Sequence, residues 1–239
     1  MLGYYGYGYY FDPTYILVVI GALISLAASA NVNSTYGRFA NVRSMTNMTG
    51  EEVARRLLSS NRISDVSVGH VGGSLTDHYD PSKKVVNLSD ATYARSSVAA
   101  IGVAAHECGH AVQHAVGYVP LKIRGALVPA ANVASYIAWP ILILGLLFNS
   151  RTGVFMINLG ILIFSLAVLF HLVTLPVEFD ASRRGLRMLE ETGILGDEEL
   201  RMARKVLRAA ALTYVASAAA AILQLLRILI LFGGRRRND

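Results

Sequence analysis

The stretch 104-AAHECGHA-111 decides how the rest of this chain is interpreted. It contains the pattern H-E-x-x-H, formed by His106, Glu107 and His110, within a run of residues that predicts a helix. Two histidines four residues apart project from one face of a helix, so both imidazoles can reach a single zinc ion, Zn²⁺. Glu107 lies beside that position and can accept a proton from the water that zinc activates. The pattern therefore indicates a metalloprotease site.

A surface helix that carries these letters by chance is the alternative interpretation. Without a metal, two histidines and a carboxylate in so apolar a surrounding would carry a heavy desolvation cost, which favours the metal site. His114 lies two turns beyond His106, about 12 Å along the helix axis, so the two cannot bind one ion together. We expect His114 to support the site or to pack, and Cys108 to be a small packing residue.

The composition points to a protein that lies partly in a membrane. Of 239 residues, 54% are hydrophobic and 16% are charged, with a mean hydropathy of +0.45. This is too apolar for an ordinary soluble domain and too charged for a chain buried wholly in lipid. A single cysteine excludes an internal disulfide. The net charge of +6 comes from basic residues beside apolar runs, so we expect it to orient the chain in a bilayer and expect no nucleic-acid partner.

Four apolar runs, at 15–30, 128–148, 154–175 and 209–232, predict transmembrane helices. The second and third are joined by five polar residues, so they should form an antiparallel hairpin. The first run ends in Ala-Ser-Ala, which resembles a signal-peptidase site, but a Tyr-rich leader replaces the usual basic region and favours an uncleaved helix. The fold class we expect is a mainly α multi-span membrane protein, with about four transmembrane helices and a zincin-like HExxH helix beside a small β-sheet.

We expect five segments along the chain. Residues 1–32 would form a Tyr-rich tail and the first transmembrane helix, and residues 33–127 the catalytic region. Residues 128–175 would form the transmembrane hairpin, and residues 176–208 a segment that holds the third metal ligand and a charged helix. Residues 209–239 would form the fourth apolar helix and a basic tail.

The polar region before the motif predicts one helix and a small sheet. Thr49 and Glu52 form a capping box that opens an amphipathic helix. Short β-prone runs at 66–68 and 85–88 are separated by turn residues. In zincin-type proteases an edge strand before the motif helix pairs with the substrate backbone, so Val85–Ser89 is our candidate substrate strand, with an ordinary structural strand as the equal alternative. His70 and His78 flank these turns and receive no role.

A zinc site with two histidines needs a third protein ligand and an open position for water. Pro176 is expected to end the third apolar run, and Glu178 follows it directly as the best-placed carboxylate. Asp180 is the second candidate. It lies two residues further on, about 200° around a helix, and so cannot face the same ion if the segment is regular.

The residues 106-HECGHAVQHA-115, the two following apolar runs and 175-LPVEFDASRR-184 resemble the YugP-type family of bacterial membrane zinc metallopeptidases, and more distantly the HtpX-like gluzincins. The resemblance implies a gluzincin site, with His106, His110 and Glu178 as zinc ligands and Glu107 as general base. In the HtpX-like relatives an aspartate four residues after the ligand glutamate orients a zinc histidine. Here that position is Ser182, which accepts a hydrogen bond but brings no charge.

The function that we expect is peptide-bond hydrolysis by a membrane-embedded, zinc-dependent endopeptidase with a peptide or protein substrate, membrane proteins included. An oxyanion-stabilising group is needed, and Tyr93, Tyr118 and Arg183 stay open as candidates. An intramembrane-type metalloprotease is one alternative, because residues 96–118 are nearly uncharged outside the site, although the chain lacks the Leu-Asp-Gly sequence of such enzymes. A catalytically idle membrane scaffold with a closed, four-ligand zinc site is the other, and Asp180 or Cys108 would have to complete it.

The distribution of basic residues predicts the orientation. We expect the chain in the bacterial inner membrane, as a multi-pass protein. The two site segments must share a side of the membrane, and most basic residues near the ends of the apolar runs lie on that side. The positive-inside rule therefore places the site in the cytoplasm, although the terminal arginines 235–237 argue for the opposite side.

Overall fold

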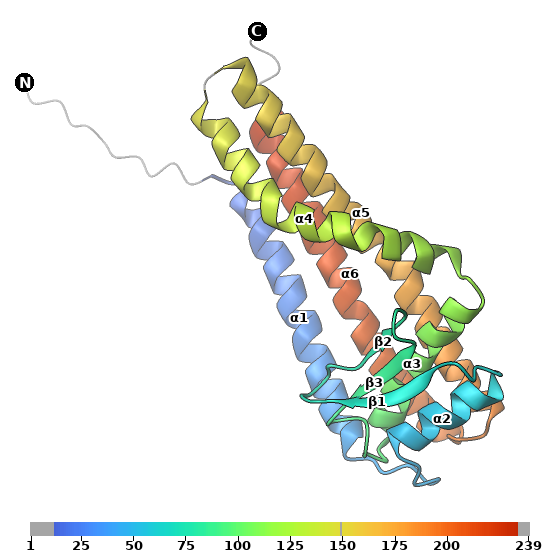
Figure 1. The fold of residues 1–239 in the computed structure, drawn as a ribbon. Helices are drawn as coiled ribbons and strands as arrows, with labels where there is room; N and C mark the ends of the chain where they lie inside the picture. Colours follow the sequence, from blue (N-terminus) through green and yellow to red (C-terminus); the bar gives the residue numbers. More distant parts are fainter. Residues whose placement is uncertain (1–11, 149, 234–239) are drawn as a thin grey trace, which may run out of the picture.

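A computed structural model of the chain describes residues 12–148 and 150–233. The Tyr-rich tail before Asp12 and the terminal basic residues lie outside the described residues. Four long helices form an elongated bundle, and the remaining elements form a compact cap at one end of it (Figure 1). The bundle consists of α1 (Tyr15–Ala40), α4 (Val119–Leu147), α5 (Arg151–Glu191) and α6 (Asp197–Gly233). The cap consists of α2 (Gly50–Ser60), α3 (Val98–Ala115), β1 (Ser67–Val71), β2 (His78–Asp80) and β3 (Val85–Ser89).

The long helices have the length and composition of membrane spans. Within the described residues, α1, α5 and α6 are each long and apolar enough to cross a bilayer. Helix α4 adds a fourth span if its halves, Val119–Ala134 and Tyr136–Leu147, count as one despite a 40° bend between them. Pro140 cannot donate a hydrogen bond to the carbonyl of Tyr136, which weakens the helix beside that bend. The expected fold class is thus confirmed.

Helix α5 corrects one expectation from the sequence. Pro176 does not end the helix, because α5 runs unbroken for 41 residues from Arg151 to Glu191. A proline removes one backbone hydrogen bond, and packing on both sides of it can hold the helix together. Here the C-terminal part of α5 lies so close to α3 that a Cβ atom built on Gly185 would sit 2.7 Å from the carbonyl oxygen of Ala105. The chain breaks its helical path further on, between Glu191 and Asp197, where α5 ends and α6 begins.

The small sheet has the strand order β1–β3–β2. Strand β3 pairs in parallel with β1 and antiparallel with β2, so it occupies the centre of the sheet. The prediction that Val85–Ser89 is a substrate strand is therefore wrong, because both of its edges already bond to neighbouring strands. The edge strands are β1 and β2, and β2 is a three-residue strand in a segment that we had interpreted as turns.

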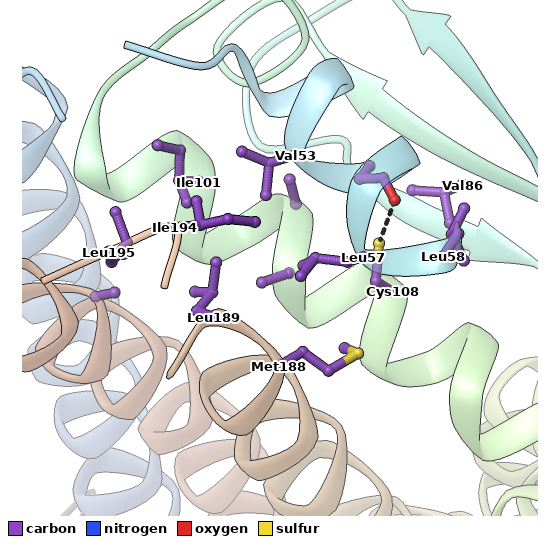
Figure 2. Packing of buried hydrophobic residues seen from close by; sticks show 14 of the residues in the cluster. Val53, Leu57, Leu58, Val86, Ile101, Cys108, Met188, Leu189, Ile194 and Leu195 are labelled. Atoms are coloured by element: carbon purple, nitrogen blue, oxygen red, sulfur yellow. Dashed lines mark hydrogen bonds between the residues drawn. The ribbon is translucent and has the colours of Figure 1, made fainter. Parts of the chain in front are cut away.

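A hydrophobic core joins the cap to the ends of α5 and α6. Leu57 from α2, Leu88 from β3, Ile101 from α3 and Leu189 from α5 are all fully buried in one cluster, which Figure 2 shows in part. Helix α2 begins with the predicted capping box of Thr49 and Glu52. The cap thus fixes α3 against α5 at the end of the bundle.

Cys108 belongs to this core. Its side chain is fully buried, and its Sγ donates to the carbonyl oxygen of Ala54 at 3.6 Å (Figure 2). Burial raises the pKa of the thiol well above its ordinary value. Cys108 is therefore a packing residue, as expected from the sequence.

Candidate metal centre

Three side chains from two helices meet at the junction of cap and bundle. His106 and His110 come from α3 and Glu178 from α5, and their potential ligand atoms all lie within 4.8 Å of one another. The Nε2 atoms of His106 and His110 lie 3.2 Å and 3.7 Å from Oε2 of Glu178. Gly109 contributes to this approach, because a Cβ atom there would collide with the carbonyl of Ala181 on α5. Small residues on facing helix surfaces thus place the carboxylate against the histidine pair.

The other ring nitrogen of each histidine is held by a polar neighbour. Nδ1 of His106 lies 3.0 Å from Oγ of Ser182, and Nδ1 of His110 lies 3.1 Å from Oε1 of Gln113. Gln113 donates through Nε2 to the carbonyl oxygen of Val177 at 2.8 Å and to Oδ2 of Asp180 at 2.9 Å. Since both of these partners only accept hydrogen bonds, the amide oxygen of Gln113 must face His110.

This network assigns the tautomer of His110. An amide oxygen cannot donate, so Nδ1 of His110 carries the hydrogen in the bond to Gln113. In the neutral ring Nε2 then presents a lone pair toward Glu178, which is the form that binds a metal ion.

Glu178 is prepared to accept a cation. Its side chain is 3% exposed, and Oε1 accepts a hydrogen bond from Nη1 of Arg124 at 2.9 Å. Oε2, which faces the two histidines, has no hydrogen-bond donor among the described residues. A buried carboxylate oxygen without a donor is costly. Two imidazole nitrogens and a carboxylate oxygen are a common ligand set for zinc with one open position, so these residues fit a zinc ion.

Asp180 is turned away from the histidines. Its carboxylate accepts from Gln113, from Nε of Arg184 at 2.5 Å and from Arg183. Asp180 and Glu178 therefore point in different directions from α5. The sequence predicts this, because residues two apart are separated by about 200° around a helix. Asp180 therefore anchors the network behind His110.

A cleft of about 470 Å³ opens over the three side chains. Glu107 lines it and is 7% exposed, and its carboxylate forms no hydrogen bond or ion pair with the part of the chain that the structure describes. The lining also includes Tyr79 of β2, Tyr118 at the start of α4 and Tyr214 of α6. A carboxylate next to a candidate metal centre, in a cleft with hydroxyl groups, is an arrangement that can move protons during hydrolysis.

The other residues considered from the sequence lie in different places. Of the three oxyanion candidates, Tyr118 lines the cleft, whereas Tyr93 and Arg183 do not. His114 is outside the ligand cluster, and its Nδ1 lies 2.8 Å from the hydroxyl of Tyr79. His70 pairs with Asp90 at 2.7 Å, away from the cleft.

Three residues of the site were missed in the sequence. Gln113 lies three residues after His110, a spacing that places it beside His110 on the helix surface and could have suggested its role. Arg124 is one of the basic residues near the ends of the apolar runs, which were used only to predict the orientation, and Tyr214 lies in an apolar run far along the chain. Nothing local to either residue indicates that it reaches the cleft.

Comparison with known proteins agrees with this geometry. Residues 14–233 match the family described as "Putative neutral zinc metallopeptidase". The chain is 44% identical over 227 residues to the "Putative membrane protease YugP" of Bacillus subtilis (strain 168), covering 94% of this chain and 99% of that protein. No solved structure shows a significant match. The match along nearly the whole chain, together with the convergence of His106, His110 and Glu178, leads to one conclusion: this chain belongs to the neutral zinc metallopeptidase family.

Proposed function

We propose that the chain is a zinc-dependent endopeptidase that hydrolyses peptide or protein substrates, membrane proteins among them, at the surface of the bilayer. His106, His110 and Glu178 would hold the zinc ion, and Glu107 would be the general base. The observation that carries the proposal is that three potential ligands and an unpaired carboxylate share one cleft.

The roles of the residues follow from their positions. Bound zinc supplies Lewis acidity, which makes a water molecule a better nucleophile and polarises the peptide carbonyl. Glu107 accepts a proton from the attacking water and passes it to the leaving amide nitrogen, so that the C–N bond breaks and a neutral amine leaves. Arg124 holds Oε1 of Glu178, which keeps Oε2 directed at the two histidines. Tyr118 and Tyr214 are the hydroxyl groups available to stabilise negative charge on the carbonyl oxygen.

We assign the substrate strand to β2. Residues Asp77, His78, Tyr79 and Pro81 line the cleft, and β2 is the sheet edge beside them. An extended peptide can add to an exposed sheet edge through backbone hydrogen bonds. A substrate bound in this way would bring one of its peptide bonds toward Glu107. Backbone hydrogen bonds would hold it, so no particular substrate side chain would be required.

The structure favours an open metal site over the scaffold alternative. A structural zinc site is closed by four protein ligands. Cys108 bonds to Ala54 within the core, and Asp180 is occupied by Gln113 and two arginines. Neither is available as a fourth ligand, and the described residues offer a cluster of three.

A membrane-surface site is also favoured over an intramembrane one. Helix α3, which carries the motif, is not among the helices of the described chain that qualify as spans. It is packed against α2 and the sheet, which are typical of a water-exposed domain. We further propose that this end of the bundle faces the cytoplasm of a bacterial inner membrane, on the basis of the basic residues near the span ends.

A peptidase assay on the purified full-length chain tests the proposal. We expect stoichiometric zinc by metal analysis and hydrolysis of a casein-like unfolded substrate that stops with a chelator and returns with added zinc. Stoichiometric zinc without turnover on either unfolded soluble or unfolded membrane substrates would support the scaffold instead.

A further inference from the structure

A second hollow lies between α5 and α6, and it shares no lining residue with the catalytic cleft. It encloses about 500 Å³. Both helices reach it where their apolar runs end, after Pro176 on α5 and before Ala209 on α6. The two helices lie side by side along this stretch (Figure 1). The hollow therefore opens at the level where the chain leaves the bilayer on the side of the cap.

Two pairs of arginines line this hollow, one pair from each helix. Arg183 and Arg187 come from α5, Arg204 and Arg208 come from α6, and all four are exposed. Each pair has a spacing of four residues, which places like charges next to each other on one helix face and destabilises an isolated helix.

The arginine charges are poorly compensated by the protein. Arg183 pairs with Asp180, but Arg187, Arg204 and Arg208 form no ion pair within residues 12–148 and 150–233. Glu190 is the one acidic residue in the lining, and it pairs with none of them. A cluster of guanidinium groups in a concave site is suited to a phosphate group, which accepts several hydrogen bonds at once.

Apart from Ser182, whose hydroxyl contacts His106, the rest of the lining is apolar. Phe179, Leu186, Leu207 and Ala211 complete the walls, and the Phe179 side chain is 50% exposed. Phe179 precedes Arg183 by one helical turn, on the side nearer the apolar run of α5. The hollow thus combines a basic rim with a hydrophobic side that is directed toward the bilayer.

We propose that this hollow binds an anionic phospholipid, with the phosphate held by Arg187, Arg204 and Arg208 and an acyl chain along Phe179. Basic pockets between transmembrane helices at the cytoplasmic face commonly bind such headgroups. A free phosphate ion would use the arginines but not the apolar wall. The proposal does not depend on the peptidase chemistry, and it goes beyond the general attraction of span-flanking charges because it requires one concave site.

The test measures the thermal unfolding midpoint of the full-length chain in detergent micelles. The micelles contain either phosphatidylglycerol or phosphatidylcholine, and a third sample has lipid-free micelles with inorganic phosphate in the buffer. The variant is Arg204→Gln/Arg208→Gln. The control is Arg201→Gln/Lys205→Gln, which removes the same charge at the same spacing on α6 but lies outside the hollow. Phosphatidylglycerol should stabilise the wild type and the control. The variant should need roughly tenfold more of it for the same shift, since each lost arginine weakens the electrostatic attraction.

Equal weakening in variant and control would overturn the proposal, because span-flanking charge alone would then explain the effect. An equal shift with inorganic phosphate or phosphatidylcholine would overturn it as well. If the double variant fails to fold, Arg187→Gln from the facing helix gives the same comparison against Lys205→Gln, with the same two outcomes.

Discussion

Gln113 offers a sharp test of how the metal centre is built. Replacement of Gln113 by leucine keeps the side-chain volume but removes the amide that contacts His110, Val177 and Asp180. Loss of these buried hydrogen bonds should lower the free energy of unfolding by about 1–3 kcal/mol. The loss is no larger because the carboxylate of Asp180 keeps its two arginine partners. Without its acceptor, the ring of His110 is free to turn, so zinc affinity should fall roughly 10–100-fold.

The assay is competition for zinc between the purified full-length chain and a fluorescent chelator, with a thermal unfolding curve recorded for each variant. Ser182→Ala is the matched control on the other histidine, because it removes one hydrogen bond to His106 and little else. It should weaken zinc binding with a smaller loss of stability. Gln113→Leu with unchanged zinc affinity and a lowered unfolding midpoint would refute the orienting role and leave Gln113 a structural residue.

Further predictions concern the third ligand, the helix contact and the topology. Glu178→Ala should abolish stoichiometric zinc in metal analysis, whereas Asp180→Ala should lower zinc affinity by roughly 10–100-fold as the loss of an outer partner; the reverse ranking would disprove the ligand assignment. Gly109→Ala should force α3 and α5 apart, because the added methyl group would collide with the carbonyl of Ala181. Denaturant unfolding should show a destabilisation of about 1–3 kcal/mol, and the zinc content should fall. A fully stable, zinc-loaded variant would contradict the close packing. Single cysteines at the exposed positions Ser82 and Arg151 should react with impermeant reagents from opposite sides of the membrane, and labelling from the same side would exclude the proposed topology.

Much of the site could be predicted because it depends on helical periodicity. The spacing of His106 and His110 fixes their common face, and the angle between Glu178 and Asp180 determines which carboxylate faces that pair. The role of Ser182 beside a zinc histidine was implied by the resemblance to the HtpX-like gluzincins, and the structure places it against His106. The two inferences from periodicity use residues that are close in sequence, on helices that the sequence itself indicates.

The remaining features depend on contacts between distant segments. The central place of Val85–Ser89 is set by pairing with β1 and β2, and the three residues of β2 carry no pattern that distinguishes them from a turn. Helix α5 continues through Pro176, and its C-terminal part packs closely against α3 at Gly185. The helix and strand propensities of single residues carry no information about such contacts between distant segments.

The most direct test of the central claim is the comparison of Glu107→Gln with the wild type for zinc content and peptide hydrolysis in the same preparations. Glutamine preserves the size of the side chain but cannot accept the proton of the attacking water. The account predicts that the variant keeps stoichiometric zinc and a wild-type unfolding midpoint while chelator-sensitive hydrolysis disappears. A variant that hydrolyses the substrate as fast as the wild type, or that loses zinc and activity together, would contradict the assignment of Glu107 as the general base.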